Sequence, residues 1–271
     1  MHDFLPTPLG RLVEVATRVL PGRVARSIRW RYCRWARAAA EVGLDVEAIG
    51  FRWRLHPADN LTERLIWLNR EHPEGQSLDW ALAALRGKRS LIVDIGANCG
   101  AFTVPLTAAA GPGSRSLAFE PNPRMLARLK ANLHLNALTQ RVEVHPVALG
   151  SATGEAVLSF SRNLGEATLR AGAAPDAQQV RVPVRPLSDY LSEAAGYEVV
   201  FLKIDVEGYE PEVLAPFFAA ASPDLWPTHI LIETEPSADW SSDLSALLAA
   251  QGYATVGMQD GNSFLELRQQ A

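Results

Sequence analysis

Three ionisable side chains stand at alternate positions in one short stretch of the chain. Lys203, Asp205 and Glu207 follow the apolar run 199–202, and Gly208 comes directly after them. Because successive side chains of a β-strand point to opposite faces, a strand here places all three on one side. Ligands of open α/β sheets bind at the carboxyl ends of the strands, so we expect this stretch to line a ligand site. Lysine is itself uncommon in the chain, with Arg supplying nearly all of the 26 basic residues.

A glycine-containing turn follows another apolar run. Residues 94–100 read Asp-Ile-Gly-Ala-Asn-Cys-Gly, and Gly96 and Gly100 let the backbone approach a ligand at the start of a helix. A dinucleotide fingerprint requires Gly-x-Gly-x-x-Gly without a carboxylate beside the pyrophosphate. Here the spacing is Gly-x-x-x-Gly and Asp94 ends the strand. The turn therefore favours a cationic ligand over a pyrophosphate.

A second acidic residue lies where a nucleoside would present its sugar. Glu120 ends the apolar run 117–119 and precedes Pro121 and Asn122. An acid at the tip of the second strand, about 20 residues after a glycine turn, is placed to accept hydrogen bonds from ribose hydroxyls. A ribose joined to a positive, phosphate-free group describes S-adenosylmethionine (SAM), so the two motifs together predict this cofactor.

From residue 90 onward the sequence alternates strands and helices, which predicts a parallel sheet of an α/β protein. Asp260-Gly261 favours a two-residue hairpin turn, so the last strand should be antiparallel to its predecessor. The predicted strands are 90–95, 115–120, 141–147, 199–205, 228–234, 253–257 and 262–268, and the predicted helices are 99–110, 122–135, 187–194, 209–219 and 240–250. Segments 155–160 and 179–184 are predicted to form a small added β pair.

Four motifs in this order resemble the FkbM-type family of SAM-dependent methyltransferases. They are the run 94–100, Phe-Glu-Pro-Asn-Pro at 119–123, Val-Ala-Leu-Gly at 147–150 and Leu-Lys-Ile-Asp-Val-Glu-Gly-Tyr-Glu at 202–210. The stretch 55–60 also looks like the segment that precedes the domain in these proteins. The resemblance extends over roughly 50–268 and implies a seven-stranded Rossmann-like sheet with an antiparallel last strand. It also implies O-methylation of a hydroxyl on a small natural product, sugar or glycan.

The resemblance assigns residues to the parts of the cofactor. It implies that Asp94, Gly96 and Asn98 line the methionine end, that Glu120 binds the ribose, and that the loop from His145 to Ala148 lies at the adenine. The complete set of residues expected to bind the cofactor is Asp94, Gly96, Asn98, Gly100, Glu120, Pro121, Asn122, Ala148 and Asp205.

An alcohol acceptor must lose a proton during methyl transfer, and the sequence offers two routes. The first is a general base, for which Asp205 is the first choice and Glu207 and Lys203 are rivals. His56 is a further candidate, since it lies in a segment that could fold over the acceptor. The second route is Mg²⁺ held by Asp205 and Glu233, provided that their strands are neighbours.

The N-terminal segment differs from the rest of the chain in charge. Residues 1–37 hold eight Arg against Asp3 and Glu14, a net charge of +6, and the formal charge of −4 leaves −10 for residues 38–271. Residues 11–39 are predicted to be helical, with Pro21-Gly22 dividing them into two helices. One stripe of this segment holds Val24, Ile28, Tyr32, Trp35 and Ala39. Either the stripe packs on the main domain, or the segment lies on an anionic membrane surface or binds an acidic partner.

These patterns predict three parts of the chain. Residues 1–48 form an Arg-rich helical extension, 49–89 a cap segment before the domain, and 90–271 the methyltransferase domain. The alternatives are a NAD(P)-dependent oxidoreductase and a nucleic-acid or protein methyltransferase. The −10 charge of the main part argues against a nucleic-acid partner.

Composition sets the remaining limits. A chain of 271 residues that is 48% apolar can bury a full core, which excludes disorder and disulfide-rich miniature scaffolds. Cys33 and Cys99 are too few for a secreted disulfide framework, and because the first ten residues lack a basic region and an unbroken apolar run, we expect no secretory signal there. We therefore expect a cytoplasmic protein, with peripheral contact at the inner face of a membrane as a further option through the Arg-rich segment.

Overall fold

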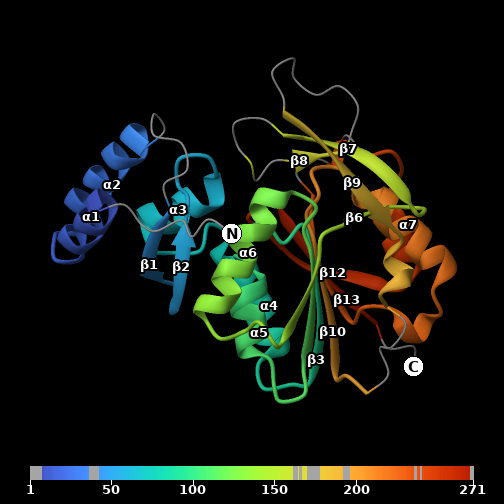
Figure 1. Ribbon diagram of the computed structural model, residues 1–271. Helices are drawn as coiled ribbons and strands as arrows, with labels where there is room; N and C mark the ends of the chain where they lie inside the picture. The colour runs from blue at the N-terminus through green and yellow to red at the C-terminus, as the bar shows by residue number, and fades with distance from the viewer. Residues whose placement is uncertain are drawn as a thin grey trace.

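The computed structural model describes residues 8–36, 43–160, 164, 167–169, 178–191, 196–234, 237, 238 and 240–268. Within these residues a seven-stranded sheet forms the centre of the molecule (Figure 1). From one edge to the other its strands are β12 (Tyr253–Gln259), β13 (Asn262–Leu267), β11 (His229–Glu233), β10 (Val199–Ile204), β3 (Ser90–Ile95), β4 (Arg115–Phe119) and β5 (Val142–His145). Strand β13 is antiparallel to both β11 and β12, while β11, β10, β3, β4 and β5 are parallel. The α/β class and the antiparallel last strand are confirmed.

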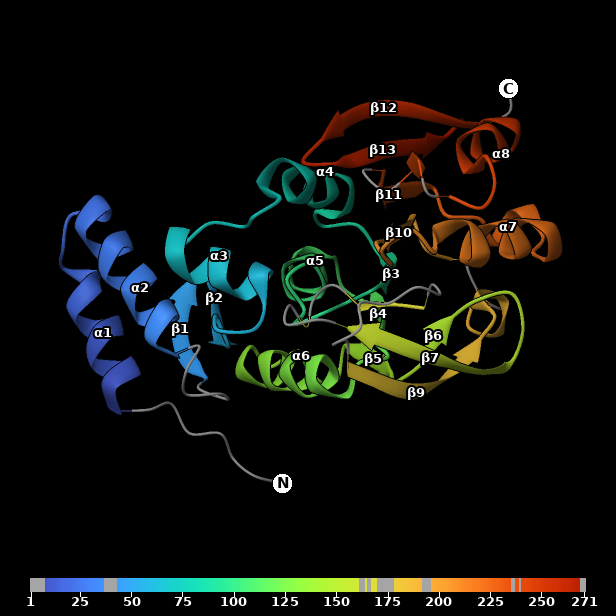
Figure 2. The same cartoon turned by 90° about the horizontal axis from the view of Figure 1, so that it is seen from above.

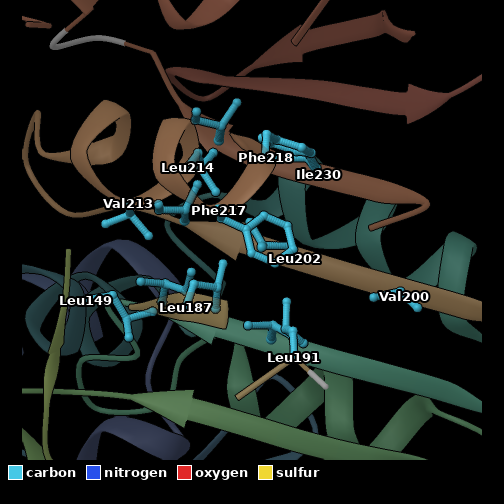
Figure 3. Packing of buried hydrophobic residues seen from close by; sticks show 14 of the residues in the cluster. Leu149, Leu187, Leu191, Val200, Leu202, Val213, Leu214, Phe217, Phe218 and Ile230 are labelled. Carbon is cyan, nitrogen blue, oxygen red and sulfur yellow. The ribbon is translucent and has the colours of Figure 1, made fainter. Parts of the chain in front are cut away.

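Helices cover both faces of this sheet, as Figure 1 shows. One face carries α4 (Gly75–Leu85), α5 (Thr103–Ala109) and α6 (Pro123–Leu135), and the other carries α7 (Glu210–Ala220) and α8 (Leu244–Ala250). The strands alternate between the two layers: Val200 and Leu202 pack beneath α7 (Figure 3), whereas Phe201 packs with α4 and α5. Because both faces are buried, the central strands are mostly apolar, with Asp94 and Lys203 near their carboxyl ends.

A second sheet lies beside the carboxyl end of the first. In the described part of the chain its strands, in order, are β6 (Ala148–Leu149), β9 (Gln178–Arg185), β7 (Gly154–Phe160) and β8 (Ala167–Thr168). The antiparallel pair of β7 and β9 confirms the predicted β pair. The helix predicted over 187–194 is wrong over its first turns, where the chain forms only the 3-10 turn Leu187–Asp189; residues 192–195 lie outside the described part.

The N-terminal part begins with the helices α1 (Pro8–Arg18) and α2 (Gly22–Ala36), which confirms the predicted division at Pro21-Gly22. Strands β1 (Leu44–Ala48) and β2 (Phe51–Leu55) then form a hairpin, and α3 (Leu61–Asn69) follows. Strand β1 was not expected from the sequence, and its pairing with β2 crosses the boundary predicted at residue 49. Figure 2 shows α1 and α2 at the end of the molecule, next to β1, β2 and α3.

The apolar stripe predicted for α2 is confirmed at Tyr32, and Ile28 is half-buried, but the stripe is wrong at its start; Ala39 and the side chain of Trp35 lie outside the described part of the chain. Val24 is exposed, whereas Ala25, Arg29, Tyr32 and Cys33 are buried. The guanidinium of Arg29 explains the rotation, because it donates to the carbonyl oxygens of Trp67 and Leu68 at the end of α3. Polar contacts therefore decide which face of α2 turns inward. No helix among the described residues combines the length and the apolar character needed to cross a membrane.

Asparagine side chains attach the β1–β2 hairpin to the main sheet. The backbone N–H groups of Arg54 and Arg52 donate to the amide oxygens of Asn132 and Asn136, one helical turn apart on α6. Asn132 also donates to the carbonyl oxygen of Cys99 in the glycine turn. The edge of β2 is thus satisfied by a helix, and the same asparagine supports the loop after β3.

Candidate functional site

Lys203 is buried at the end of β10 among acidic groups. Its Nζ lies 3.1 Å from Oδ2 of Asp205 and 4.0 Å from Oδ1 of Asp94, its partner in register on β3, and donates to the carbonyl oxygen of Gly96 at 3.3 Å. Burial would lower the pKa of this ammonium, but Asp205 and Asp94 outweigh burial and raise its pKa above the ordinary value. A lysine held as a cation cannot accept a proton, so this environment argues against the base role for Lys203.

Asp205 and Glu233 lie side by side because β10 and β11 are neighbouring parallel strands, with Ile204 opposite Ile232. Burial, together with the charges of Asp205 and Glu207, raises the pKa of Glu233 to about 9. Glu233 is therefore a neutral carboxyl at pH 7, next to the carboxylate of Asp205. The sequence predicted the two acids and their proximity, but not the proton that one of them keeps.

Glu207 reaches the same region by a different route from the one predicted. Strand β10 ends at Ile204, so alternation along a strand does not extend to Glu207. Glu207 instead has a left-handed backbone, with a φ of 56°, in the turn before α7. Such a conformation is uncommon for a residue with a side chain. Its charge still acts on Glu233, so all three residues of the predicted stretch contribute to one cluster.

Two residues of this cluster were missed in the sequence. Glu74 is within electrostatic range of Lys203 and Asp205, and burial raises its pKa. His72 packs its ring edge-on to Phe102 at 4.7 Å, and burial lowers its pKa to about 4. The chain between α3 and α4 brings both residues to the sheet. No local pattern marks them, because they lie more than 100 residues from the strand that they approach.

The glycine turn fits closely against the end of β10. A side chain on Gly96, where φ is 79°, would lie 2.0 Å from the carbonyl oxygen of Asp205, so only glycine fits there. Gly100 has a different reason: a side chain there would lie 2.8 Å from Leu129 of α6. Gly96 therefore joins the two strand ends of the site, whereas Gly100 serves helix packing and does not line the pocket described below.

Backbone amides of two neighbouring loops hold Glu120. Its two carboxylate oxygens accept the N–H of Asn98 at 2.8 Å and the N–H of Asn122 at 2.7 Å. Burial raises its pKa to about 7, although these hydrogen bonds lower it. The side-chain oxygen of Asn122, a fully buried residue, accepts the N–H of Arg124 and caps α6. Asn122 therefore joins Glu120 to the start of that helix. A carboxylate oxygen has lone pairs beyond one N–H bond, so Glu120 can still accept ribose hydroxyls.

An apolar pocket of about 40 Å³ lies on the α7 side of these loops. Three residues predicted to bind a cofactor line it: Gly96, Pro121 and Ala148. Val147, also in the wall, belongs to the loop that the resemblance places at the adenine, and the other walls, which are mainly aliphatic, were not predicted. They comprise Ile95, Phe119, Leu149, Leu158, Leu169, Val206 and Tyr209. Gly96 is common to the pocket and to the charged cluster around Lys203, so the two regions adjoin.

Two predicted site residues, Asp94 and His56, are buried. Asp94 is buried, accepts a hydrogen bond from the hydroxyl of Thr103, and keeps one oxygen without a hydrogen-bond partner. His56 packs against Glu63 beneath Arg128, and burial and that cation lower its pKa to about 3. His56 is therefore too weak a base, and too enclosed, for the proton-accepting role that the sequence left open.

The cap segment touches the glycine turn at one point. Asn60, fully buried, caps α3 by accepting the N–H of Glu63, and its amide donates to the side-chain oxygen of Asn98 at 2.9 Å. That same oxygen accepts the N–H of Cys99, and Asn98 has a positive φ of 51°. Asn60 thus fixes the conformation of the residue whose amide holds Glu120.

The donor set does not support the predicted magnesium site. Lys203 already supplies a positive charge 3.1 Å from Asp205, and Glu233 carries a proton at neutral pH. Across the described residues, no group of three or more His, Cys, Asp or Glu side chains is arranged to hold a metal ion. We therefore derive no step through a metal.

Comparison with known proteins gives a family match over the sheet and its site. A profile described as the methyltransferase FkbM domain matches residues 94–266. A curated protein of Streptomyces tacrolimicus, 31-O-demethyl-FK506 methyltransferase FkbM, is 27% identical over 202 residues, which cover 63% of this chain and 75% of that protein. The matched range 94–266 lies inside the predicted segment 90–271.

Solved structures of related architecture are more distant. The methyltransferase FkbM from Methylobacillus flagellatus KT is 21% identical with a TM-score of 0.45, over 75% of this chain and 52% of that one. This chain therefore spans about half the length of that protein. An O-methyltransferase from Bacillus cereus, solved in complex with SAH, is 14% identical with a TM-score of 0.46, over 97% of this chain and 98% of that one.

Proposed function

The chain belongs to the FkbM methyltransferase family, and from that premise we propose that it transfers the methyl group of SAM to a hydroxyl oxygen of a small natural product, sugar or glycan. The observation that carries the proposal is the carboxylate of Asp205, held by Lys203 beside Gly96 at the edge of the sheet. The curated relative is named for its action on 31-O-demethyl-FK506, which supports an oxygen acceptor.

Charge supports SAM as the donor. Asp205, Asp94 and Glu74 gather around the ammonium of Lys203, and Glu207 acts on the neighbouring Glu233, so the cluster favours a cationic ligand over a pyrophosphate. The apolar pocket suits a flat heteroaromatic ring, and Glu120 lies beside Pro121 of its wall. In the proposed arrangement the adenine end occupies the pocket, Glu120 binds the ribose, and the methionine end passes Gly96 toward Asp205.

When bound, SAM supplies a methyl group already activated by its sulfonium. The protein must then align the acceptor oxygen with that methyl group and remove the hydroxyl proton. We assign the proton to the carboxylate of Asp205 as the oxygen–carbon bond forms and the carbon–sulfur bond breaks. Lys203 pairs with the carboxylate of Asp205 and orients it, and it is a positioning residue in this scheme.

The proposed division of the chain into three parts moves one predicted boundary. The methyltransferase domain is the sheet with its helices over 90–271, and the cap segment of residues 49–89 closes one side of the glycine turn through Asn60. The Arg-rich extension, predicted as residues 1–48, is shortened in this proposal. Strand β1 (Leu44–Ala48) pairs with β2 of the cap segment and is assigned to that segment.

The alternatives receive less support. A NAD(P)-dependent oxidoreductase needs a pyrophosphate beside the glycine turn, where Asp94 is fully buried with one oxygen unpaired. A nucleic-acid acceptor would meet a main domain with a net negative charge.

One experiment tests the proposed function. The purified chain is incubated with SAM and a panel of hydroxyl-bearing natural products and sugars, with and without EDTA. We expect a methyl mass increment on at least one acceptor, of equal yield in both conditions, because Lys203 and not a metal accompanies Asp205. Methylation of nitrogen or carbon alone would reject the O-methyltransferase assignment, and loss of activity with EDTA would reject the metal-free scheme.

A further inference from the structure

Helix α1 presents its apolar face to solvent and its polar face to the protein. Leu12 and Val15 lie on one side of the helix and Val19 directly follows its last residue; they are 65%, 63% and 84% exposed and are called the apolar stripe below. The buried face of the same helix carries Glu14 and Thr17. A helix that packs on a globular core ordinarily has the opposite arrangement. Packing among the described residues therefore does not explain the exposed stripe.

Specific polar contacts fix this orientation. Glu14 accepts hydrogen bonds from the indole N–H of Trp67 and from Arg70, at the end of α3. Thr17 accepts one from Arg29, which also donates to two carbonyl oxygens of α3. Burial opposes the ionisation of Glu14, but Arg70 outweighs burial and lowers its pKa. Rotating α1 to bury Leu12 and Val15 would break these bonds and deprive the buried indole N–H of Trp67 of its acceptor.

The surface around the stripe is strongly basic. Exposed arginines flank the stripe on α1 and cover the outward face of α2: Arg11, Arg18, Arg23, Arg26, Arg31 and Arg34. Trp30 is 49% exposed on the same face of α2, with the guanidinium of Arg34 over its ring. Within residues 8–36 the sequence contains one acidic residue, the buried Glu14.

We propose that the α1–α2 hairpin docks on an anionic membrane surface, with Leu12, Val15 and Val19 in the headgroup region and the arginines at lipid phosphates. Apolar residues, a tryptophan and flanking arginines are the combination that binds such an interface. A nucleic acid would satisfy the arginines but leave the apolar stripe in water. A second copy of the chain would bring arginines against arginines, because no exposed acid lies on the hairpin.

Hydrogen bonds through α3 connect the α1–α2 hairpin to the cofactor site. Arg29 and Glu14 hold the C-terminal end of α3, and Asn60 at its other end contacts Asn98. A helix of nine residues is about 14 Å long. Docking would therefore hold the cofactor turn near the lipid surface, although vesicle binding itself does not require the proposed methyl transfer.

The test is flotation of the full chain with vesicles, without SAM. We expect binding to vesicles of phosphatidylcholine mixed with phosphatidylglycerol, weaker binding at high salt, and none to phosphatidylcholine alone. The apolar variant V15S/V19S and the charge variant R23Q/R34Q should each lower the partition coefficient, by about tenfold and about 30-fold respectively.

Matched controls change equally exposed residues elsewhere. V256S/M258S removes apolar surface that is 50% and 63% exposed on β12, and R86Q/R181Q removes two exposed charges. Both controls should bind vesicles as the unaltered chain does, and thermal unfolding verifies that all variants are folded. Absence of binding to the anionic vesicles, or equal binding by surface and control variants, would overturn the proposal. A dimer in sedimentation that V15S/V19S dissolves, without vesicle binding, would replace it with self-association.

Discussion

Asp205 lies between a cation and a neutral acid, and this arrangement decides which group can take a proton. Lys203 is held as an ammonium 3.1 Å away, and Glu233 keeps its proton at pH 7 because burial and two nearby carboxylates raise its pKa to about 9. Of the acids first considered at this edge, Asp205 pairs with the buried lysine and is partly open to solvent. It is the residue on which proton removal is expected to depend.

Replacing the carboxylate of Asp205 tests this role directly. Asp205→Asn should lower kcat by about 10²–10⁴-fold, the usual contribution of a general base, and leave SAM affinity within about threefold. The readouts are single-turnover methyl transfer and calorimetric SAM binding. Asp224→Asn, an exposed aspartate far along the chain, is the matched control and should retain activity. Full turnover by Asp205→Asn would show that another group removes the proton.

Glu233 should make stability depend on pH. Its pKa rises from 4.5 when unfolded to about 9 when folded, so the folded state binds the extra proton between these values. Its contribution to stability is complete below pH 4.5 and is lost as the pH rises through about 9. Glu233→Gln cannot lose a proton, so its urea midpoint should exceed that of the unaltered chain increasingly from pH 5 to pH 9.

The control for Glu233→Gln is Glu155→Gln, which removes an exposed carboxylate on β7. Its midpoint should follow that of the unaltered chain at every pH. Parallel curves for Glu233→Gln and the unaltered chain would mean that Glu233 is ionised in the folded protein at neutral pH.

At the scale of elements, α3 connects the N-terminal hairpin to the cofactor turn. Arg29 donates to carbonyl oxygens at its C-terminal end, and Asn60 both caps its N-terminal end and orients Asn98. Asn132 of α6 makes a second link, since it binds the edge of β2 and the carbonyl oxygen of Cys99. Two asparagines therefore hold the glycine turn from opposite sides.

Asn60→Ser separates the two roles of this asparagine. Serine can still cap α3, but it has no amide to donate to Asn98, so Glu120 should lose its fixed position. We expect about tenfold weaker SAM binding and a stability loss of about 1–2 kcal/mol. Asp243→Ala removes the cap of α8, away from the turn, and should cost stability without affecting SAM binding. Unchanged SAM affinity in Asn60→Ser would show that the cap segment does not support the turn.

The elements most dependent on local pattern were predictable. The seven strands of the main sheet appear within two residues of the predicted ends, because burial on both faces leaves long apolar runs between turns. The register of α2 was not predictable, since a buried Arg29 that binds another helix outweighs apolar periodicity. The predicted helix at 187–194 failed for a similar reason: Leu187 and Leu191 pack beneath α7 from a turn, at a spacing that also suits a helix.

On the scale of the whole molecule, the site depends on contacts that no local pattern contains. The motifs indicated Lys203, Asp205 and Glu120, and the structure places these at neighbouring strand ends. It also brings Glu74 and His72 to Lys203 from the cap segment, and it gives Gly100 a packing reason where a ligand contact was expected. Such pairings follow from the order of strands in the sheet and the path of the connecting chain.

The uneven charge of the sequence has a spatial counterpart. The basic hairpin of α1 and α2 lies at one end of the molecule (Figure 2), and the acidic cluster around Lys203 lies at the carboxyl edge of the sheet. Polar contacts between Glu14, Arg29 and α3 orient the hairpin so that its arginines and its apolar stripe face outward. The two charged regions can therefore bind different partners at the same time.

Calorimetric titration of the purified chain with SAM and with NADH tests the central claim most directly, when it is repeated on Glu120→Ala. Two ribose hydroxyls bonded to a carboxylate predict saturable SAM binding that Glu120→Ala weakens at least about tenfold, with no binding of NADH to either protein. Binding of NADH without SAM, or equal SAM affinity in Glu120→Ala, would contradict the account of a methyl-donor site at the ends of β3 and β4.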